Sequence, residues 1–317
     1  MSRILLTAVG SMAAAPAARR YQALGHTVFG CDIYPRAWTP LAGEIDFFQA
    51  RLATEGEPYV EQLKETVRRN GLDFLIPLTD PEVDALAPRK AEFRALGCTV
   101  CVPEERVAAL CRRKDKMNRF LAEKQVCRLI PTESAVPGQP CPFPFPVMVK
   151  PRSGRSSLGQ AVAADEKSYQ TALAGREDCI VQPFLEGDIF CVDVARDAFG
   201  HTRAAARQEL LRNKSGLGMT VEVLPGHPLE AVCAAIAEAV GLVGVVNMEF
   251  IRHGDDFFFL EVNPRFSGGV GFSMAAGMDF AEMMLCCHSC GSVEAFPAAP
   301  KHALLARESA IVLTQLR

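Results

Sequence analysis

The sequence has almost no net charge and no long hydrophobic run. Its 34 Lys and Arg residues nearly balance 37 Asp and Glu residues, which gives a formal charge of −3. No general attraction to nucleic acid or to an anionic membrane surface is therefore expected. No apolar run reaches the roughly 20 residues of a membrane-spanning helix, and no internal repeat or low-complexity tract is present. These absences predict a globular cytoplasmic protein without a nucleic-acid or membrane partner.

Cysteine, in contrast, is frequent, with 12 residues spread from Cys31 to Cys290. Residues 3–9 are interpreted as a buried strand rather than as the apolar part of a signal peptide. Without a secretion signal, the thiols are expected to be reduced and buried rather than paired in a disulfide framework. A Cys and His cluster at 286–290 is explained by helix packing as well as by a metal site.

The first third of the chain alternates short apolar runs with amphipathic segments. This pattern predicts strands at 3–9, 28–32, 74–78 and 99–102, and helices at 13–25, 58–70 and 81–96. Such alternation is typical of a doubly wound α/β unit with a parallel sheet. Beyond a helical region at 106–125 the pattern becomes mixed α+β. Strands are expected there at 147–150, 180–182, 189–196, 203–210, 244–252 and 257–263, and helices at 228–240 and 272–290.

The loop after the first strand has only part of a dinucleotide-binding motif. Gly10 follows this strand, and Asp32 ends the second strand about twenty residues later, as in folds that bind NAD. The second and third glycines are absent, and side chains in their place hinder close approach of a pyrophosphate. We therefore expect a Rossmann-like scaffold without a dinucleotide. Its sheet edge can still hold substrate, and Asp80 and Glu82 are candidate lining residues there.

Two apolar strands in the second half carry regularly spaced acids and amides. Asn247 and Glu249 share one face of the first strand, and Glu261 and Asn263 share one face of the second. In a hairpin centred near Asp255, Glu249 stands opposite Glu261, where like charges repel each other. A hard cation with oxygen ligands relieves such repulsion. Glu249, Glu261 and Asn263 are therefore predicted to bind Mg²⁺, with a solvated surface hairpin as the alternative.

Basic residues near this hairpin indicate a phosphate. Arg265 follows the second strand and precedes a glycine-containing loop, 267–269. Its guanidinium can bind a phosphate that is held by the same cation. Lys150 ends another apolar strand, where a buried cation needs an anionic partner such as a nucleotide phosphate.

Two further segments fit a nucleotide. The small residues of 152–159 offer backbone N–H groups for a flap over phosphates, although such a loop is often a plain hairpin turn. The segment Gln182-Pro183-Phe184-Leu185 combines extended backbone with apolar side chains, which can bind an adenine ring. A simple connection between a strand and a turn explains this second segment equally well.

The order of these motifs resembles the ATP-grasp superfamily, and within it the branch of the carbamoyl phosphate synthase large subunit. The resemblance covers nearly the whole chain. It is carried by Lys114-Asp115-Lys116, Val149-Lys150-Pro151, the segment 181–187, Asn247-Met248-Glu249-Phe250 and the segment 261–269. It implies an α/β Rossmann-like (pre-ATP-grasp) domain at 1–112 and an α+β ATP-grasp fold of two lobes, the small lobe at 113–186 and the large lobe at 187–317.

The resemblance also implies a role for each matching residue. Lys116 and Lys150 would contact the ATP phosphates, and residues 182–185 would hold the adenine. Arg265 and Lys150 would act on the transferred phosphoryl group. Glu249, Glu261 and Asn263 would bind two Mg²⁺ ions, with Mn²⁺ as an alternative. The residues assigned to substrate are Arg207, Lys214, Asp80, Glu82, Gly268 and Gly269.

One position departs from the family pattern. Family members often have an acid two residues after the hinge glycine, where it binds the ribose. This position follows Gly187 and Asp188 and is occupied by Ile189. The remaining alternatives are that Asp188 or Glu186 takes over this role, or that the ribose contact is absent.

The function implied by the resemblance is ATP-dependent ligation of a small carboxylate to an amine. An acyl-phosphate would form with Mg²⁺, and ADP and phosphate would be released. A homodimer is compatible with the resemblance. An ATP-binding regulatory module and a kinase-like enzyme that stops at the acyl-phosphate are alternatives. An NAD-binding oxidoreductase is disfavoured by the incomplete glycine motif.

Overall fold

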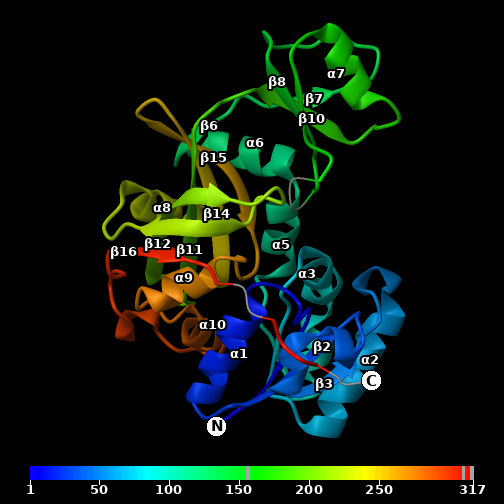
Figure 1. Cartoon of the computed structure of the whole chain (residues 1–317), viewed down its shortest axis with the longest axis vertical. Coiled ribbons are helices and arrows are strands. Elements are labelled where there is room, and N and C mark those ends of the chain that lie inside the picture. Colours follow the sequence, from blue (N-terminus) through cyan, green and yellow to red (C-terminus); the bar gives the residue numbers. More distant parts are fainter. Residues whose placement is uncertain (155–157, 309–310, 315–317) are drawn as a thin grey trace.

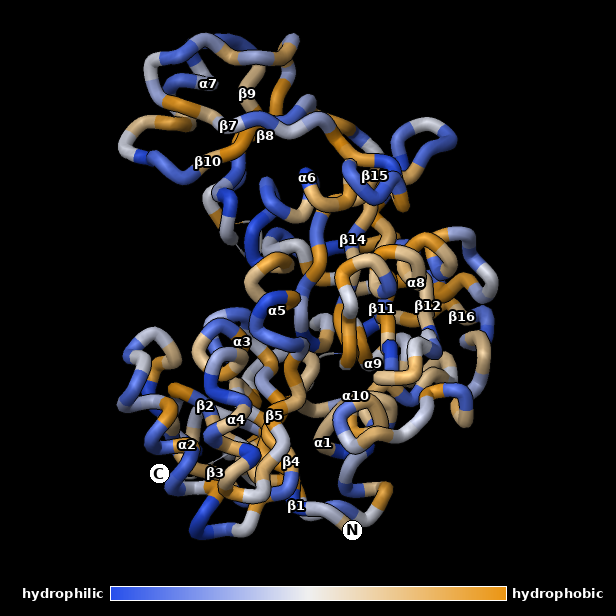
Figure 2. Tube along the Cα trace, turned by 180° about the vertical axis from the view of Figure 1, so that it is seen from behind, coloured by the Kyte–Doolittle hydropathy of each residue, from blue (hydrophilic) through white to orange (hydrophobic). Residues whose placement is uncertain are grey.

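The computed structural model of the chain shows three β-sheets arranged along its long axis (Figure 1). It describes residues 1–154, 158–308 and 311–314. A parallel sheet near the N-terminus lies at one end in Figure 1, a large sheet lies in the middle, and a small sheet lies at the other end. Hydrophobic residues are concentrated in the strands, and hydrophilic residues are concentrated in many of the loops and outer helices (Figure 2).

The first sheet has the strand order β3-β2-β1-β4-β5, and all its neighbouring strands are parallel. Its strands are β1 (Arg3–Leu6), β2 (Thr27–Asp32), β3 (Asp46–Gln49), β4 (Phe74–Ile76) and β5 (Thr99–Val100). The helices of this Rossmann-like unit are α1 (Ala14–Ala23), α2 (Glu57–Asn70), α3 (Asp80–Leu86) and α4 (Lys90–Arg94). The strand order reverses between β1 and β4, and in such folds ligands bind beyond the strand ends at this point.

Both faces of the first sheet are covered, which explains its continuous apolar strands. Ile4 and Leu6 belong to a core that contains residues of α1. Leu5, whose side chain points to the opposite face, belongs to a core that contains Leu63 of α2. The predicted doubly wound unit is therefore confirmed, and burial of alternate residues on two faces is its physical cause.

The second sheet is antiparallel and has the order β7-β10-β8-β9. Its strands are β7 (Glu133–Ala135), β8 (Val147–Pro151), β9 (Ala161–Ala163) and β10 (Cys179–Pro183), and α7 (Glu166–Leu173) packs on it. We call this sheet with α7 the small lobe.

The third sheet has the order β16-β13-β12-β11-β14-β15-β6. Its strands are β6 (Arg128–Leu129), β11 (Asp188–Arg196), β12 (Thr202–Arg212), β13 (Gly218–Val223), β14 (Gly244–His253), β15 (Asp256–Asn263) and β16 (Ala303–Ala306). The short β6 is parallel to β15, whereas the other pairs are antiparallel. The associated helices are α5 (Glu105–Arg112), α6 (Lys114–Lys124), α8 (Pro228–Val240), α9 (Val270–Ala275) and α10 (Phe280–His288). We call this sheet with α8, α9 and α10 the large lobe.

The Rossmann-like unit and the large lobe share one hydrophobic core, which includes residues of α1, α10 and β14. The buried hydroxyl of Tyr21 on α1 donates to the carbonyl of Ala281 on α10 at 2.9 Å. Arg20 forms an ion pair of 2.6 Å with Asp279 beside it. Helix α1 of the Rossmann-like unit is thereby fixed against the large lobe.

Two predicted helices are divided in the structure. The segment 81–96 forms α3, a 3-10 turn at Ala87–Arg89 and α4, because Pro88 lacks the N–H that a continuous helix needs. The segment 272–290 forms α9 and α10, separated at Gly277, whose φ of +97° does not occur in a helix. The helix predicted at 228–240 is confirmed as α8, which begins with Pro228 and ends before the left-handed Gly241.

Several short elements are not evident from the sequence pattern, among them β3, β6, β7, β9, α7 and β13. Further 3-10 turns lie at Arg36–Trp38, Pro40–Gly43, Ala53–Glu55 and Val293–Ala295. Within the described ranges, no helix is both long enough and apolar enough to cross a membrane. All twelve cysteines are free; eight of them are buried as predicted, whereas Cys127, Cys141 and Cys286 are partly exposed and Cys290 is exposed.

Candidate active site

A cavity of about 840 Å³ lies where the three sheets meet. Loops after β1 and β4 contribute Ser11, Met12, Thr79 and Asp80. The small lobe contributes Met148, Lys150 and Gln182, and the large lobe contributes strands β11, β12, β14 and β15. The cavity is large enough for a nucleotide with a second small molecule beside it.

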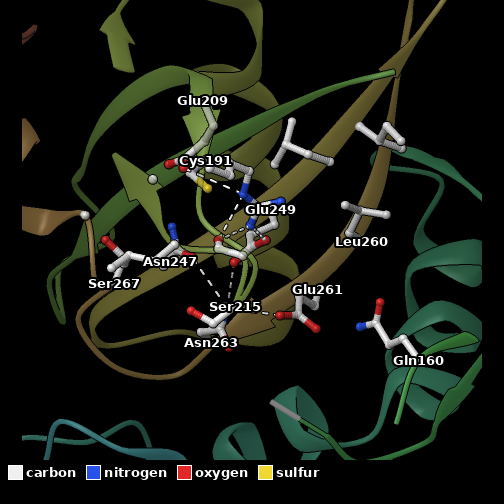
Figure 3. A pocket seen from close by; sticks show the side chains of 18 of the residues that line it. Gln160, Cys191, Glu209, Ser215, Asn247, Glu249, Leu260, Glu261, Asn263 and Ser267 are labelled. Atoms are coloured by element: carbon white, nitrogen blue, oxygen red, sulfur yellow. Dashed lines mark hydrogen bonds and ion pairs between the residues drawn. The ribbon is translucent and has the colours of Figure 1, made fainter. Parts of the chain in front are cut away.

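Two rows of side chains cross the large sheet at the cavity floor. In one row, Arg207 of β12, Cys191 of β11, Glu249 of β14 and Glu261 of β15 are successive cross-strand partners. In the next row, Asp193, Asn247 and Asn263 are partners in the same way. Figure 3 shows Glu249, Asn247 and Asn263 close together in the cavity, with Glu261 beside them. The predicted pairing of Glu249 with Glu261 is confirmed.

A β-bulge creates this pairing. From the turn, His253 pairs with Asp256, and the register continues regularly to Phe250 and Phe259. It then shifts by one residue, so that Glu249 faces Glu261 instead of Leu260. Without the bulge, Glu249 would lie opposite an apolar side chain, because a one-residue shift reverses which face a side chain occupies.

The pKa values of the two carboxylates are shifted in opposite directions by their surroundings. Their side chains are only 20% and 21% exposed. Burial, and then repulsion from Glu261, raises the pKa of Glu249 to about 7. Burial would also raise the pKa of Glu261, but Lys114, at 2.8 Å from its carboxylate, lowers it instead. Asn263 Nδ2 lies 3.4 Å from each carboxylate.

Two lysines face the same carboxylates. Lys114 and Lys150 are 8% and 6% exposed. Burial, and then the charge of Lys114, lowers the pKa of Lys150 to about 8. Together they line a small recess beside Gly154 and Leu158, next to the main cavity. Two buried ammonium groups against the single carboxylate of Glu261 leave a local excess of positive charge, which suits an anion.

Lys116 does not reach this cavity. It lies on the exposed side of α6, two residues from Lys114. Residues two apart in a helix point in different directions, so only one of the two lysines can face the carboxylates. Lys114 lies there, whereas the resemblance to ATP-grasp enzymes predicts that Lys116 binds phosphate.

Comparisons with known proteins bear on the family and the fold. A family model described as ATP-grasp in the biosynthetic pathway with Ter operon matches residues 175–309. The formate-dependent phosphoribosylglycinamide formyltransferase of Synechococcus sp. (strain CC9605) is 27% identical over 273 residues. This match covers 77% of the chain and 64% of that relative, so the chain spans less than two thirds of the relative's length.

Solved structures show the same architecture. The biotin carboxylase of Campylobacter jejuni, in a β,γ-ATP complex, has a TM-score of 0.74 at 17% identity, over 92% of this chain and 72% of that one. N5-carboxyaminoimidazole synthetase of Staphylococcus aureus with ADP has a TM-score of 0.71 at 14% identity, over 96% and 80%. The chain has the ATP-grasp fold, and its residues 175–309 match an ATP-grasp family model.

In this ATP-grasp fold, the predicted adenine segment lines the cavity with Gln182, Pro183, Phe184 and Leu185. The side chain of Gln182 does not point freely at a base, because its Nε2 donates to Thr132 Oγ1 at 2.6 Å. Its backbone and the apolar side chains of Met148, Ile130, Ile251 and Leu260 remain for a ring.

The position at which the resemblance places a ribose contact is apolar in this chain. Ile189 lines the cavity, whereas neither Asp188 nor Glu186 is among its lining residues. Asp188 instead pairs with Arg252 on β14. Of the flap predicted at 152–159, residues 155–157 lie outside the described residues, and Leu158 lines the cavity.

Arg207 lines the cavity, but protein groups occupy its guanidinium. Nη1 donates to Asp193 Oδ2 at 2.6 Å, Nη2 donates to Ser267 Oγ at 3.1 Å, and Nε donates to Glu209 Oε1 at 3.3 Å. Burial opposes the charged form, yet Asp193 and other anionic neighbours raise the pKa of Arg207. A Cβ on Gly269 would lie 2.6 Å from Nη2, so Arg207 shapes the loop at 267–269.

The other predicted substrate residues divide into two groups. Asp80, Gly268 and Gly269 line the cavity. Lys214 is exposed at the β12–β13 turn, and Glu82 accepts hydrogen bonds from the backbone and hydroxyl of Thr79 at the start of α3. Neither of these two is among the lining residues.

The structure adds residues that the sequence analysis did not single out. Arg212 lies 3.6 Å from Glu249 and 3.8 Å from Glu209. Burial, and then the charge of Glu249, raises the pKa of Cys191 well above its usual value. In the part of the chain that is described, no three His, Cys, Asp or Glu side chains are grouped to hold a metal ion. The candidate ligand set therefore remains two carboxylates and one amide.

Proposed function

We propose that the chain is an ATP-dependent ligase that joins a carboxylate to an amine through an acyl-phosphate, with Mg²⁺. The supporting observation is the cluster of Glu249, Glu261 and Asn263 on one face of the large sheet, opposite Lys114 and Lys150. Paired carboxylates are suited to a divalent cation and neighbouring lysines to a phosphate, and a metal–phosphate site needs both.

The residues present fit the predicted metal. Hard oxygen ligands suit Mg²⁺. Burial, and then the charge of Glu261, raises the pKa of Glu249, and a cation beside the pair would favour the ionised form of Glu249. The Asn263 amide needs only to rotate by half a turn to present its oxygen instead of its nitrogen. When bound, the cation would neutralise phosphate charge.

In the proposed reaction, an oxygen of the substrate carboxylate attacks the γ-phosphorus of ATP, the bond to the β,γ-bridging oxygen breaks, and ADP leaves. Lys150 and Arg265 line the cavity and are proposed to stabilise the charge on the phosphoryl oxygens, which dominates catalysis of such transfers. The amine then attacks the acyl carbon, phosphate leaves and the amine proton is released. Lys114 would bind ATP phosphate in place of Lys116.

The relatives suggest the first substrates to test. The Synechococcus protein is named for its dependence on formate, a small carboxylate, and for formyl transfer to phosphoribosylglycinamide. The test measures ADP released by the chain with ATP, Mg²⁺, formate and other small acids, with and without amines. Hydroxylamine would trap an acyl-phosphate as a hydroxamate. Hydroxamate without any amide product would favour the kinase-like alternative.

A pair of matched variants examines the site. Glu261→Gln is expected to lower substrate-dependent ADP release at least about 100-fold, because it removes transition-state electrostatics. Glu222→Gln is the control, since Glu222 lies on β13 of the same sheet, pairs with His302 at 2.8 Å and does not line the cavity. Equal activity of the two variants would refute the metal assignment.

A further inference from the structure

Asp80 reaches Arg265 from another part of the fold. Asp80 begins α3 in the Rossmann-like unit, and Arg265 follows β15 in the large lobe. Asp80 Oδ1 lies 3.2 Å from Arg265 Nε, and Arg265 Nη2 donates to Asp80 Oδ2 at 3.3 Å. The second contact is a hydrogen bond, and the first is an ion pair alone, since Asp80 Oδ1 has no hydrogen-bond partner among the described residues. Together they restrain the position of the guanidinium.

The remaining contacts of Arg265 come from its own segment. Nη1 donates to the carbonyl of Phe266 at 2.9 Å, and Nη2 donates to Asn263 Oδ1 at 3.3 Å. The side chain is 17% exposed. Asp80 is therefore the acid that pairs with Arg265 among the described residues.

Asp80 has little freedom of its own. It is 1% exposed, and the guanidinium of Arg112 on α5 lies 3.8 Å from its Oδ2. Arg112 is in turn paired with Asp84 at 3.0 Å. The carboxylate lines the cavity, yet its oxygens face arginines, so its protein contacts favour holding Arg265 over binding substrate.

We infer that Asp80 is a positioning residue that orients Arg265 toward the transferred phosphoryl group. The inference rests on the proposed function. It makes the Rossmann-like unit part of the phosphoryl-transfer machinery, although none of its residues is expected to touch that group. A small displacement of a charged group in such a site lowers the rate by about 100-fold.

The test uses binding of ADP with aluminium fluoride, a mimic of the transferred phosphoryl group, so that the acid and amine substrates need not be known. Asp80→Asn is expected to weaken binding of this mimic by about 10- to 100-fold, because Arg265 is proposed to contact the transferred phosphoryl group that the mimic replaces. The affinity for ADP alone is expected to change by less than about twofold, because ADP lacks that group. A purely structural role of Asp80 would weaken both equally.

A double-mutant cycle with Arg265→Met isolates the contact. In that background, Asp80→Asn is expected to cause no further loss of mimic binding. If Asp80→Asn does not fold, Asp80→Glu replaces it, because this variant keeps the buried charge. Asp80→Glu is expected to cause a smaller loss of affinity for the mimic, and this loss should disappear in the Arg265→Met background. The inference would be overturned if the fold-losses in affinity for the mimic multiplied in the double variants. It would also be overturned if Asp80→Asn bound the mimic as tightly as the wild-type protein does. Failure of the wild-type protein to bind ATP or the mimic would instead overturn the proposed function.

Discussion

Arg207 on β12 and Asp193 on β11 form a fully buried ion pair, with 2.6 Å between Nη1 and Oδ2 and 1% of each residue exposed. The hydroxyl of Ser273 donates to the same Asp193 oxygen at 2.7 Å. Through Ser267, the pair also holds the loop that follows Arg265. A buried charge pair of this kind is tolerated only when both partners are present.

Arg207→Met is therefore expected to destabilise the protein by about 3–5 kcal/mol, because it leaves Asp193 buried and unpaired. The measurement is urea-induced unfolding of the wild-type and variant proteins. In the double variant Arg207→Met with Asp193→Asn, the free energy of unfolding should fall by much less than the sum of the decreases in the two single variants. Additive losses would show that the two side chains do not depend on each other.

Lys114 and Lys116 provide a charge-matched comparison within one helical turn. Lys114→Met is expected to weaken ATP binding in the presence of Mg²⁺ by about 10- to 100-fold, since it removes a charged hydrogen-bond donor from the recess. Lys116→Met removes the same charge from the exposed side of α6 and should change affinity less than about twofold. Calorimetric titration measures both. A greater loss in Lys116→Met would restore the assignment made from the sequence.

His288 predicts a pH dependence of stability. Its Nε2 has no hydrogen-bond partner among the residues that the structure describes, and it faces Gly244. Burial, and then the charge of Lys90, lowers its pKa from 6.5 to about 3. Below pH 6.5 the unfolded chain binds a proton that the native protein does not bind. Stability is therefore complete above pH 6.5 and is lost as the pH falls toward 3, by up to about 1.4 kcal/mol per pH unit.

His288→Gln removes this titration and should flatten the dependence of unfolding free energy on pH between 6.5 and 4. Carboxylates also titrate over this range, so the comparison is between the slopes of the two proteins in denaturant titrations. Parallel curves would show that His288 is protonated in the native state as readily as in the unfolded chain.

Local sequence pattern determined much of this protein. Alternation along two strands placed Glu249 and Asn247 on one face and Glu261 and Asn263 on one face. The helix α8 was set by Pro228, its apolar face and Gly241. These features depend on neighbours in sequence, which is why motif order alone predicted the α/β unit followed by ATP-grasp lobes.

Tertiary structure decided the rest. The sequence does not show the bulge before Glu261, which brings it opposite Glu249, or which of Lys114 and Lys116 faces the sheet. Nor does it show that Asp80 lies against Arg265, 185 residues away in the chain. Each depends on how one element packs against a distant one, and burial of a whole face selects that arrangement.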